Sequence, residues 1–274
     1  MSEPTRAAVA HPAPEGIDLL EQTATAVRTA GSVLRERFGE VVRYRTRDEL
    51  MGALADNDNA VLDSLRPRLE ALRPDAGWVA EELDGGALPA GEWWVVDPAE
   101  GNVNHLHALP EWAVTATLVR DNRPVLTVVH LPLTGETYTA LAGGGAHLDG
   151  RPLRVSETAD LGLSIAATSQ ARPDEQENVV RRVGSSITEM LLDALVVRIA
   201  VPATLHLLNV AAGRIDVFWQ FAGARADLLP GALLVTEAGG RISTAAGQPW
   251  TPDSDSFLAS APGVHTAAVA TLSR

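Results

Sequence analysis

The chain has 274 residues, of which 46% are hydrophobic and 21% charged, so it is long enough to bury a sizeable core. Its formal net charge is −13 and it contains no lysine, which excludes a P-loop or a lysine Schiff base and argues against a nucleic-acid partner. The chain also lacks cysteine, which excludes disulfides and thiolate sites and is compatible with the cytoplasmic location that we expect. No apolar run approaches the roughly 18–20 residues that cross a bilayer, so we expect no membrane association.

The first half of the chain is predicted to hold two helices followed by short strands. Residues 1–15 are rich in alanine and proline and read as a disordered tail rather than a signal peptide. Apolar residues at helical spacing predict helices over Ile17–Phe38 and Asn59–Leu72, the second with Pro67 inside it. The pattern then favours strands, which are expected at Trp93–Val96, Trp112–Val119, Val125–His130, Thr137–Leu141 and Ala146–Leu148.

The second half alternates strands with helices. Strands are predicted at Ser164–Thr168, Val196–Ile199 and Ile215–Phe218. Helices are predicted at Glu175–Val183, Ile187–Leu192, Thr204–Ala212 and Asp227–Ala238. Such alternation is typical of α/β or α+β layers, and we expect one domain over residues 16–274, with halves at 16–157 and 158–274.

Three acidic segments stand at the predicted edges of elements. They are the pair Glu81-Glu82, the run from Asp97 to Asn102 after a strand, and Asp227 at the start of a helix. Carboxylates in such places can converge on Mg²⁺, which prefers oxygen ligands, and Gly101 would allow backbone N–H groups to face a phosphate. Taken singly, a solvated turn, a strand-ending turn and a helix cap would each explain one of them.

The run from Asp97 to Asn104 resembles the signature Asp-Pro-x-Asp-Gly-Thr-x-Asn of the inositol monophosphatase family. Glu81-Glu82 resembles the glutamate pair that precedes that signature. Leu229–Gly240 is similar to the segment after the last metal-binding aspartate, and Val128–Ser156 is similar to the middle strands of the family. The resemblance covers Ile17 to Gly240, which is nearly the whole chain.

The resemblance implies a layered α-β-α-β-α sandwich of the inositol monophosphatase and fructose-1,6-bisphosphatase type. It further implies a homodimer and Mg²⁺-dependent hydrolysis of a small phosphorylated metabolite, a phosphate monoester. By position, the metal ligands would be Glu81, Asp97, Glu100, Asp227 and the carbonyl of Ala99. Glu81 and Asn102 would orient the attacking water, the N–H groups of Gly101 and Asn102 would hold phosphate, and Gln220 would contact the substrate.

Several positions depart from the family pattern. Glu100 stands where the signature has Asp, Asn102 where it has Thr, and Ala226 where a Trp usually precedes the last Asp. The upstream Val-Thr-x-x-Asp segment has lost its Thr, and either Asp56 or Asp58 matches its Asp. The alternative interpretation is therefore a repurposed or non-catalytic member of the family, in which the nearby His105 and His107 supply acid–base chemistry or simply pack.

Overall fold

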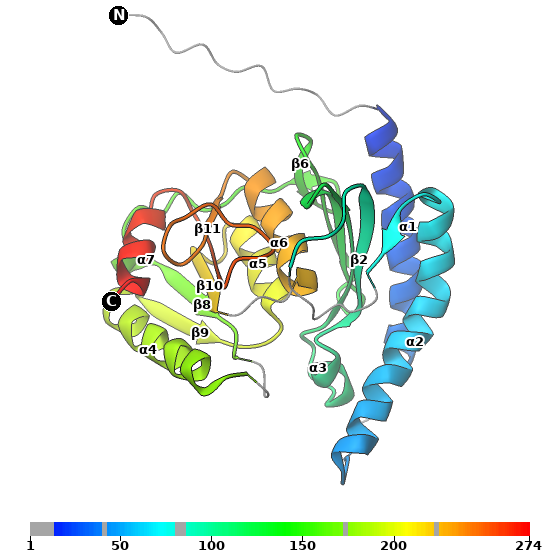
Figure 1. Cartoon of the computed structure of the whole chain (residues 1–274), viewed down its shortest axis with the longest axis horizontal. Helices are drawn as coiled ribbons and strands as arrows, with labels where there is room; N and C mark the ends of the chain where they lie inside the picture. Colours follow the sequence, from blue (N-terminus) through cyan, green and yellow to red (C-terminus); the bar gives the residue numbers. More distant parts are fainter. Residues whose placement is uncertain (1–13, 40–42, 80–85, 172–174, 222–224) are drawn as a thin grey trace, which may run out of the picture.

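The computed structural model describes residues 14–39, 43–79, 86–171, 175–221 and 225–274. Within these ranges the chain forms two β-sheets and seven α-helices in five layers (Figure 1). The order of the layers is two helices, a large sheet, two helices, a small sheet and two further helices. This arrangement confirms the predicted α-β-α-β-α sandwich, and the division into halves at residue 157 stays a prediction.

The first layer consists of α1 (Pro14–Glu36) and α2 (Arg47–Leu72), which pack on each other and on one face of the large sheet. The strands of that sheet follow chain order: β1 (Gly77–Trp78), β2 (Glu92–Glu100), β3 (Ala113–Arg120), β4 (Arg123–Leu131), β5 (Glu136–Leu141), β6 (Gly145–Leu148) and β7 (Arg151–Pro152). Every pair is antiparallel except β1 with β2. Apolar side chains of α1, α2 and the sheet, among them Trp94 and Leu65, form one buried core.

The central layer consists of α5 (Ala203–Ala211) and α6 (Arg225–Glu237), which contact both sheets. The small sheet has the strand order β11-β12-β10-β8-β9. Its strands are β8 (Ile165–Thr168), β9 (Val196–Ile199), β10 (Val217–Phe221), β11 (Arg241–Ser243) and β12 (Ser256–Ser260). Side chains from both sheets and the central helices, such as Leu207 and Phe218, share a second core.

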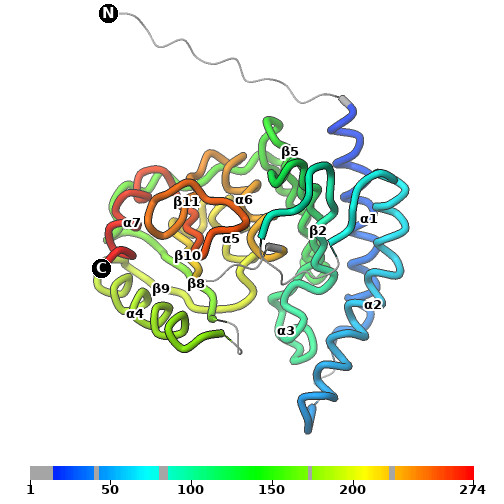
Figure 2. The backbone as a smooth tube through the Cα atoms, viewed as in Figure 1, coloured from blue at the N-terminus to red at the C-terminus, as the bar shows by residue number. Residues whose placement is uncertain are grey.

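The last layer consists of α4 (Glu177–Asp193) and α7 (His265–Leu272), which lie on the outer side of the small sheet. Figure 2 shows this pair on the opposite side of the molecule from α1 and α2. The short helices are α3 (Asn102–Leu106), directly after β2, and a 3₁₀ turn at Leu161–Leu163. No helix in the described part of the chain combines the length and the apolar character needed to cross a bilayer.

Three elements, α2, α4 and β2, differ in extent from their predictions. Helix α2 begins twelve residues before Asn59, where the Thr46 hydroxyl accepts a hydrogen bond from the Glu49 N–H at 3.2 Å. Its buried face includes the polar Asn57, which interrupts the apolar pattern from which the helix was predicted. Helix α4 is continuous rather than two helices, although Gly184 lies within it, and β2 does not stop at Asp97.

The C-terminal elements add two further corrections. Helix α6 begins at Arg225, so Asp227 is its third residue rather than its N-cap, and Pro230 lies in its second turn. The chain after Gly240 forms β11, β12 and α7, for which the sequence pattern gave no prediction. Strand β12 pairs antiparallel with both β10 and β11, and the two added strands complete the small sheet.

Candidate metal centre

A β-bulge at the end of β2 brings Asp97 and Glu100 to the same side of the strand. In a regular strand, residues three apart face opposite sides of the sheet. Here Asp97 pairs with Thr115 and Glu100 pairs with Ala113, so β2 has one residue more than β3 across this interval. The extra residue shifts the alternation by one and lets both carboxylates face the same space. Pro98 fits inside the bulge because it has no N–H to donate to the ladder.

The first residues of α6 supply a third carboxylate. One carboxylate oxygen from each of Asp97, Glu100 and Asp227 lies within 4.8 Å of the other two. Asp97 is 8% exposed and Glu100 is 2% exposed, whereas Asp227 is partly exposed. Like charges this close repel each other, and a bound cation would relieve that repulsion. The donors are all oxygens, so the cluster fits a hard divalent cation such as Mg²⁺.

The backbone around the carboxylates is held in place by short contacts. The Asp97 carboxylate accepts a hydrogen bond from the Ala99 N–H at 3.0 Å, which closes a turn inside the bulge. Gly101 has φ = 80°, and a Cβ at this position would lie 2.6 Å from the Glu111 carbonyl oxygen. Glycine is therefore required where β2 gives way to α3.

Thr204, near the start of α5, contacts this cluster from the second half of the chain. Its hydroxyl donates toward the Glu100 Oε2 at 3.1 Å and toward the Asp227 backbone oxygen at 2.8 Å. Sequence reasoning did not single out Thr204, since an isolated threonine in an apolar helix has no distinguishing pattern.

The side chain of Asn102 is held by helix α2. Its Nδ2 donates to the Leu54 carbonyl at 3.0 Å and to Asp58 Oδ1 at 2.8 Å. Its Oδ1 accepts from Asn57 Nδ2 at 2.9 Å. These contacts use both amide hydrogens and the oxygen, so in this conformation the amide is oriented toward α2. The contact with Asn102 also distinguishes Asp58 from Asp56, between which the sequence did not decide.

Asn57 connects Asn102 to a second polar side chain, His105. The Nε2 of His105 lies 2.9 Å from the Leu34 carbonyl, which can only accept, so Nε2 carries a proton and Nδ1 accepts from Asn57 at 3.0 Å. Arg37 Nε donates to Asn57 Oδ1 at 2.9 Å. We call Arg37, Asn57, Asp58, Asn102 and His105 the amide network. It joins α2 and the end of α1 to α3.

Two titratable groups of the amide network have shifted pKa values. Burial raises the pKa of Asp58 from 3.8 to about 6, although the hydrogen bond from Asn102 acts in the opposite direction. Burial lowers the pKa of His105, which disfavours its charged form. The ring of His105, on α3, packs against Phe38 and Trp112, while His107 is exposed.

Two further site residues were predicted, Glu81 and Gln220. Glu81 and its neighbour Glu82 lie outside the described residues, so the roles expected for Glu81 stay predictions. Gln220 is buried near the end of β10, and its Oε1 accepts a hydrogen bond from the Ser169 hydroxyl at 2.7 Å. The strand that carries Gln220 leads through residues 222–224 to the helix of Asp227.

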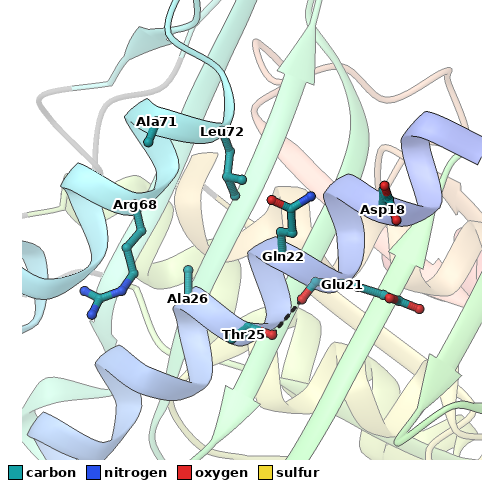
Figure 3. A pocket seen from close by; sticks show the side chains of 8 residues that line it. All are labelled: Asp18, Glu21, Gln22, Thr25, Ala26, Arg68, Ala71 and Leu72. Atoms are coloured by element: carbon teal, nitrogen blue, oxygen red, sulfur yellow. Dashed lines mark hydrogen bonds between the residues drawn. The ribbon is translucent and has the colours of Figure 1, made fainter.

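A surface cavity of about 500 Å³ lies between α1 and α2 (Figure 3). Residues of these two helices line it, among them Asp18, Gln22 and Arg68. The Thr25 hydroxyl at its edge donates to the Glu21 carbonyl at 2.9 Å, within its own helix. None of the clustered carboxylates lines this cavity, so the carboxylates rather than the cavity locate the candidate site.

The fold and the site together define a layered α/β protein with an acidic site suited to a divalent cation. Residues 18–274 match the model of the inositol monophosphatase family. The chain is similar to the inositol-1-monophosphatase of Rhizobium meliloti, at 34% identity over 84% of this chain and 86% of that protein. It is also similar to the Nus factor SuhB of Pseudomonas aeruginosa, at 32% identity over 80% of this chain and 82% of that protein.

A solved structure agrees with these sequence matches. The Thermotoga maritima IMPase superposes with a TM-score of 0.79 and 27% identity, over 93% of this chain and 97% of that one. The chain therefore belongs to the inositol monophosphatase family, as the Asp97–Asn104 run predicted. Membership is consistent with phosphatase activity at the level of the family.

Proposed function

We propose that this protein hydrolyses a small phosphate monoester in a Mg²⁺-dependent reaction. The observation that carries the proposal is the approach of Asp97, Glu100 and Asp227 to within 4.8 Å in a member of this family. The substrate class follows from the family, whose relatives include proteins named inositol-1-monophosphatase. Sugar, cyclitol and nucleotide monophosphates are the candidates.

In the proposed reaction, one group of residues binds the metal ion and another binds the substrate. Asp97, Glu100 and Asp227 would hold Mg²⁺, together with Glu81 and the carbonyl of Ala99. When bound, the ion supplies a more acidic water and stabilises charge on the leaving oxygen. The N–H groups of Gly101 and Asn102 are assigned to the phosphate, and Gln220 to the rest of the substrate. The oxygen of water bonds to phosphorus while the bond from phosphorus to the ester oxygen breaks. A proton from the water ends on that oxygen, which yields phosphate and an alcohol.

The proposal is tested by phosphate release from sugar, inositol and nucleotide monophosphates with and without Mg²⁺. Asp97→Asn is the matched variant because an asparagine oxygen can still accept the hydrogen bond from Ala99, so the turn inside the bulge is preserved. Asp253→Asn, on an exposed aspartate, controls for general loss of charge. Metal-dependent release that only the first variant abolishes supports the proposal. No release by the wild type over the whole panel would overturn it.

A second candidate function is a role as a binding partner without hydrolysis. Two observations favour it: two relatives are named Nus factor SuhB, and the amide of Asn102 is oriented toward α2 rather than toward the carboxylate cluster. This function predicts no phosphate release from any member of the panel, with or without Mg²⁺, which is the opposite of the outcome expected above. The same measurements therefore separate the two candidates.

We also propose that the protein forms a homodimer through the edge of the small sheet that β9 forms. Strand β9 lies at one end of that sheet. On it and just before it are four exposed apolar side chains, Leu192, Leu195, Val196 and Ile199, of which Leu192 is 72% exposed. An exposed apolar edge strand is a surface that proteins usually cover. Light scattering should show a dimer that Ile199→Glu dissociates and Met51→Glu, an exposed site on α2, does not.

A further inference from the structure

Thr204 lies against the carboxylate cluster without belonging to it. It is the second residue of α5, which contacts both α6 and the small sheet. Its side chain is fully buried, with 0% exposure. From this position the hydroxyl oxygen lies 3.1 Å from Glu100 Oε2 and 2.8 Å from the backbone oxygen of Asp227. One side chain therefore contacts two of the three residues that form the cluster.

The chemistry of a hydroxyl explains why these two contacts belong together. Thr204 has one proton to donate, and both neighbours are acceptors, so the proton is shared between the Glu100 carboxylate and the Asp227 carbonyl. A threonine side chain has few rotamers, and a buried one is held in place by its packing. The hydroxyl is therefore a fixed point between the end of β2 and the first turn of α6.

Of the three clustered carboxylates, that of Glu100 has the most conformational freedom, so a fixed hydrogen-bond donor restricts it most. A glutamate has one more rotatable bond than an aspartate, so its carboxylate can occupy more positions relative to the backbone. The cluster requires a Glu100 oxygen within 4.8 Å of the oxygens of Asp97 and Asp227. A hydrogen bond from a buried donor restricts that freedom to the position in which the three carboxylates meet.

We propose that Thr204 is a positioning residue that holds the Glu100 carboxylate beside Asp97 and Asp227 and thereby sets the affinity of the site for a divalent cation. The inference rests on the proposed function, because it concerns the same metal site. Partners that orient metal ligands typically change affinity by about ten- to a hundredfold when they are removed. Removal of the Thr204 hydroxyl is expected to weaken cation binding by that factor.

The experiment measures Mn²⁺ binding to the metal-free protein by electron paramagnetic resonance, so that no substrate or turnover is needed. Thr204→Val keeps the shape and removes the hydroxyl, whereas Thr204→Ser keeps the hydroxyl. The first variant should bind Mn²⁺ about ten- to a hundredfold more weakly than the wild type, and the second within about threefold of it. If Thr204→Val does not fold, Thr204→Ala removes the same group.

A second background tests the assignment to Glu100. Glu100→Asp shortens the side chain by one methylene and withdraws the carboxylate from the hydroxyl. In that background Thr204→Val should change Mn²⁺ affinity by less than about threefold, because the contact is already lost. An equal loss in both backgrounds would show that the hydroxyl acts through Asp227 or the fold, and would overturn the inference.

The outcomes also separate this inference from the proposed function. If the wild type binds Mn²⁺ and the folded Thr204→Val variant binds it equally well, the inference fails and the metal site stands. If the wild type binds no Mn²⁺ and releases no phosphate with Mg²⁺, the proposed function fails and the inference fails with it.

Discussion

The carboxylate cluster and the amide network each contain one residue at which the run from Asp97 to Asn104 departs from the family signature. The two departures have different structural consequences. In the cluster, Glu100 replaces an aspartate, and its carboxylate still lies with Asp97 and Asp227. In the network, Asn102 replaces a threonine, and its amide is hydrogen-bonded to Leu54, Asn57 and Asp58.

The difference follows from the groups that each side chain carries. A carboxylate only accepts, so Glu100 can lie against a donor such as Thr204 and still present oxygen to a cation. An amide carries two donor hydrogens and an acceptor, and a half-buried amide is stable where all of them are paired. Helix α2 offers those partners through residues on one of its faces. Glu100 therefore still provides a carboxylate to the cluster. The side chain of Asn102 instead links α3 to α2 by hydrogen bonds.

The largest expected effect comes from removal of a carboxylate of the cluster. Asp227→Asn should lower kcat/KM by about a hundredfold or more, because a lost ligand removes several kcal/mol of charge stabilisation. Initial rates of phosphate release at saturating Mg²⁺ measure this effect. Asp255→Asn, on an exposed aspartate, should leave the rate unchanged. Equal rates for wild type and Asp227→Asn would remove this residue from the site.

The amide network should contribute chiefly to stability. Asn57→Leu keeps the volume of the side chain but leaves Arg37, Asn102 and His105 without the partner that Asn57 provides. The free energy of unfolding should fall by about 2–4 kcal/mol, since each buried polar group that loses its partner costs about 1–3 kcal/mol. Urea denaturation measures the change. Asn59→Leu, at an exposed position on the same helix, should cost less than about 0.5 kcal/mol.

A third variant, Asn102→Ala, tests whether the amide of Asn102 acts on the substrate. Asn102→Ala keeps the backbone N–H and removes the contacts with α2, so stability should fall by about 1–2 kcal/mol. Because the amide is oriented toward α2, kcat should fall by less than about tenfold, which corresponds to 1.4 kcal/mol. Steady-state kinetics and urea denaturation of the same preparation give both numbers. A hundredfold loss of kcat at unchanged stability would restore the catalytic role expected from the sequence.

The smallest expected effect is a pH dependence that Asp58 confers. Its raised pKa of about 6 means that the folded protein retains a proton that the unfolded chain has released. This group therefore contributes stability that is fully present below about pH 4 and is lost as the pH rises through about 6.

In the Asp58→Asn variant a neutral amide replaces the protonated acid, so the decrease in stability with rising pH that Asp58 causes should disappear. In metal-free buffer the free energy of unfolding of the variant relative to the wild type should rise by about 1 kcal/mol between pH 5 and pH 8, a value reduced for solvent screening of a partly exposed group. The lowered pKa values of His105 and the other buried histidines are common to both proteins and cancel in the difference. A difference that does not change with pH would contradict the assignment.

The sequence determined the layered fold and most of its strands. The segments Val125–His130 and Val196–Ile199, for example, lie in strands as predicted. The full extent of α2 was not predicted because a polar residue, Asn57, lies on its buried face. The elements after Gly240 were not predicted because their sequences show too little periodicity.

The sequence also identified the acids that the structure brings together, because Asp97, Glu100 and Asp227 follow a recognisable order along the chain. Their surroundings were decided by tertiary structure alone. The approach of Thr204 from α5 and the orientation of Asn102 toward α2 join residues from 44 to 104 positions apart. The bulge in β2 depends on the pairing of this strand with β3. Local sequence patterns describe neighbours along a helix or strand, whereas the direction of a buried polar side chain depends on partners that only the packing of distant elements supplies.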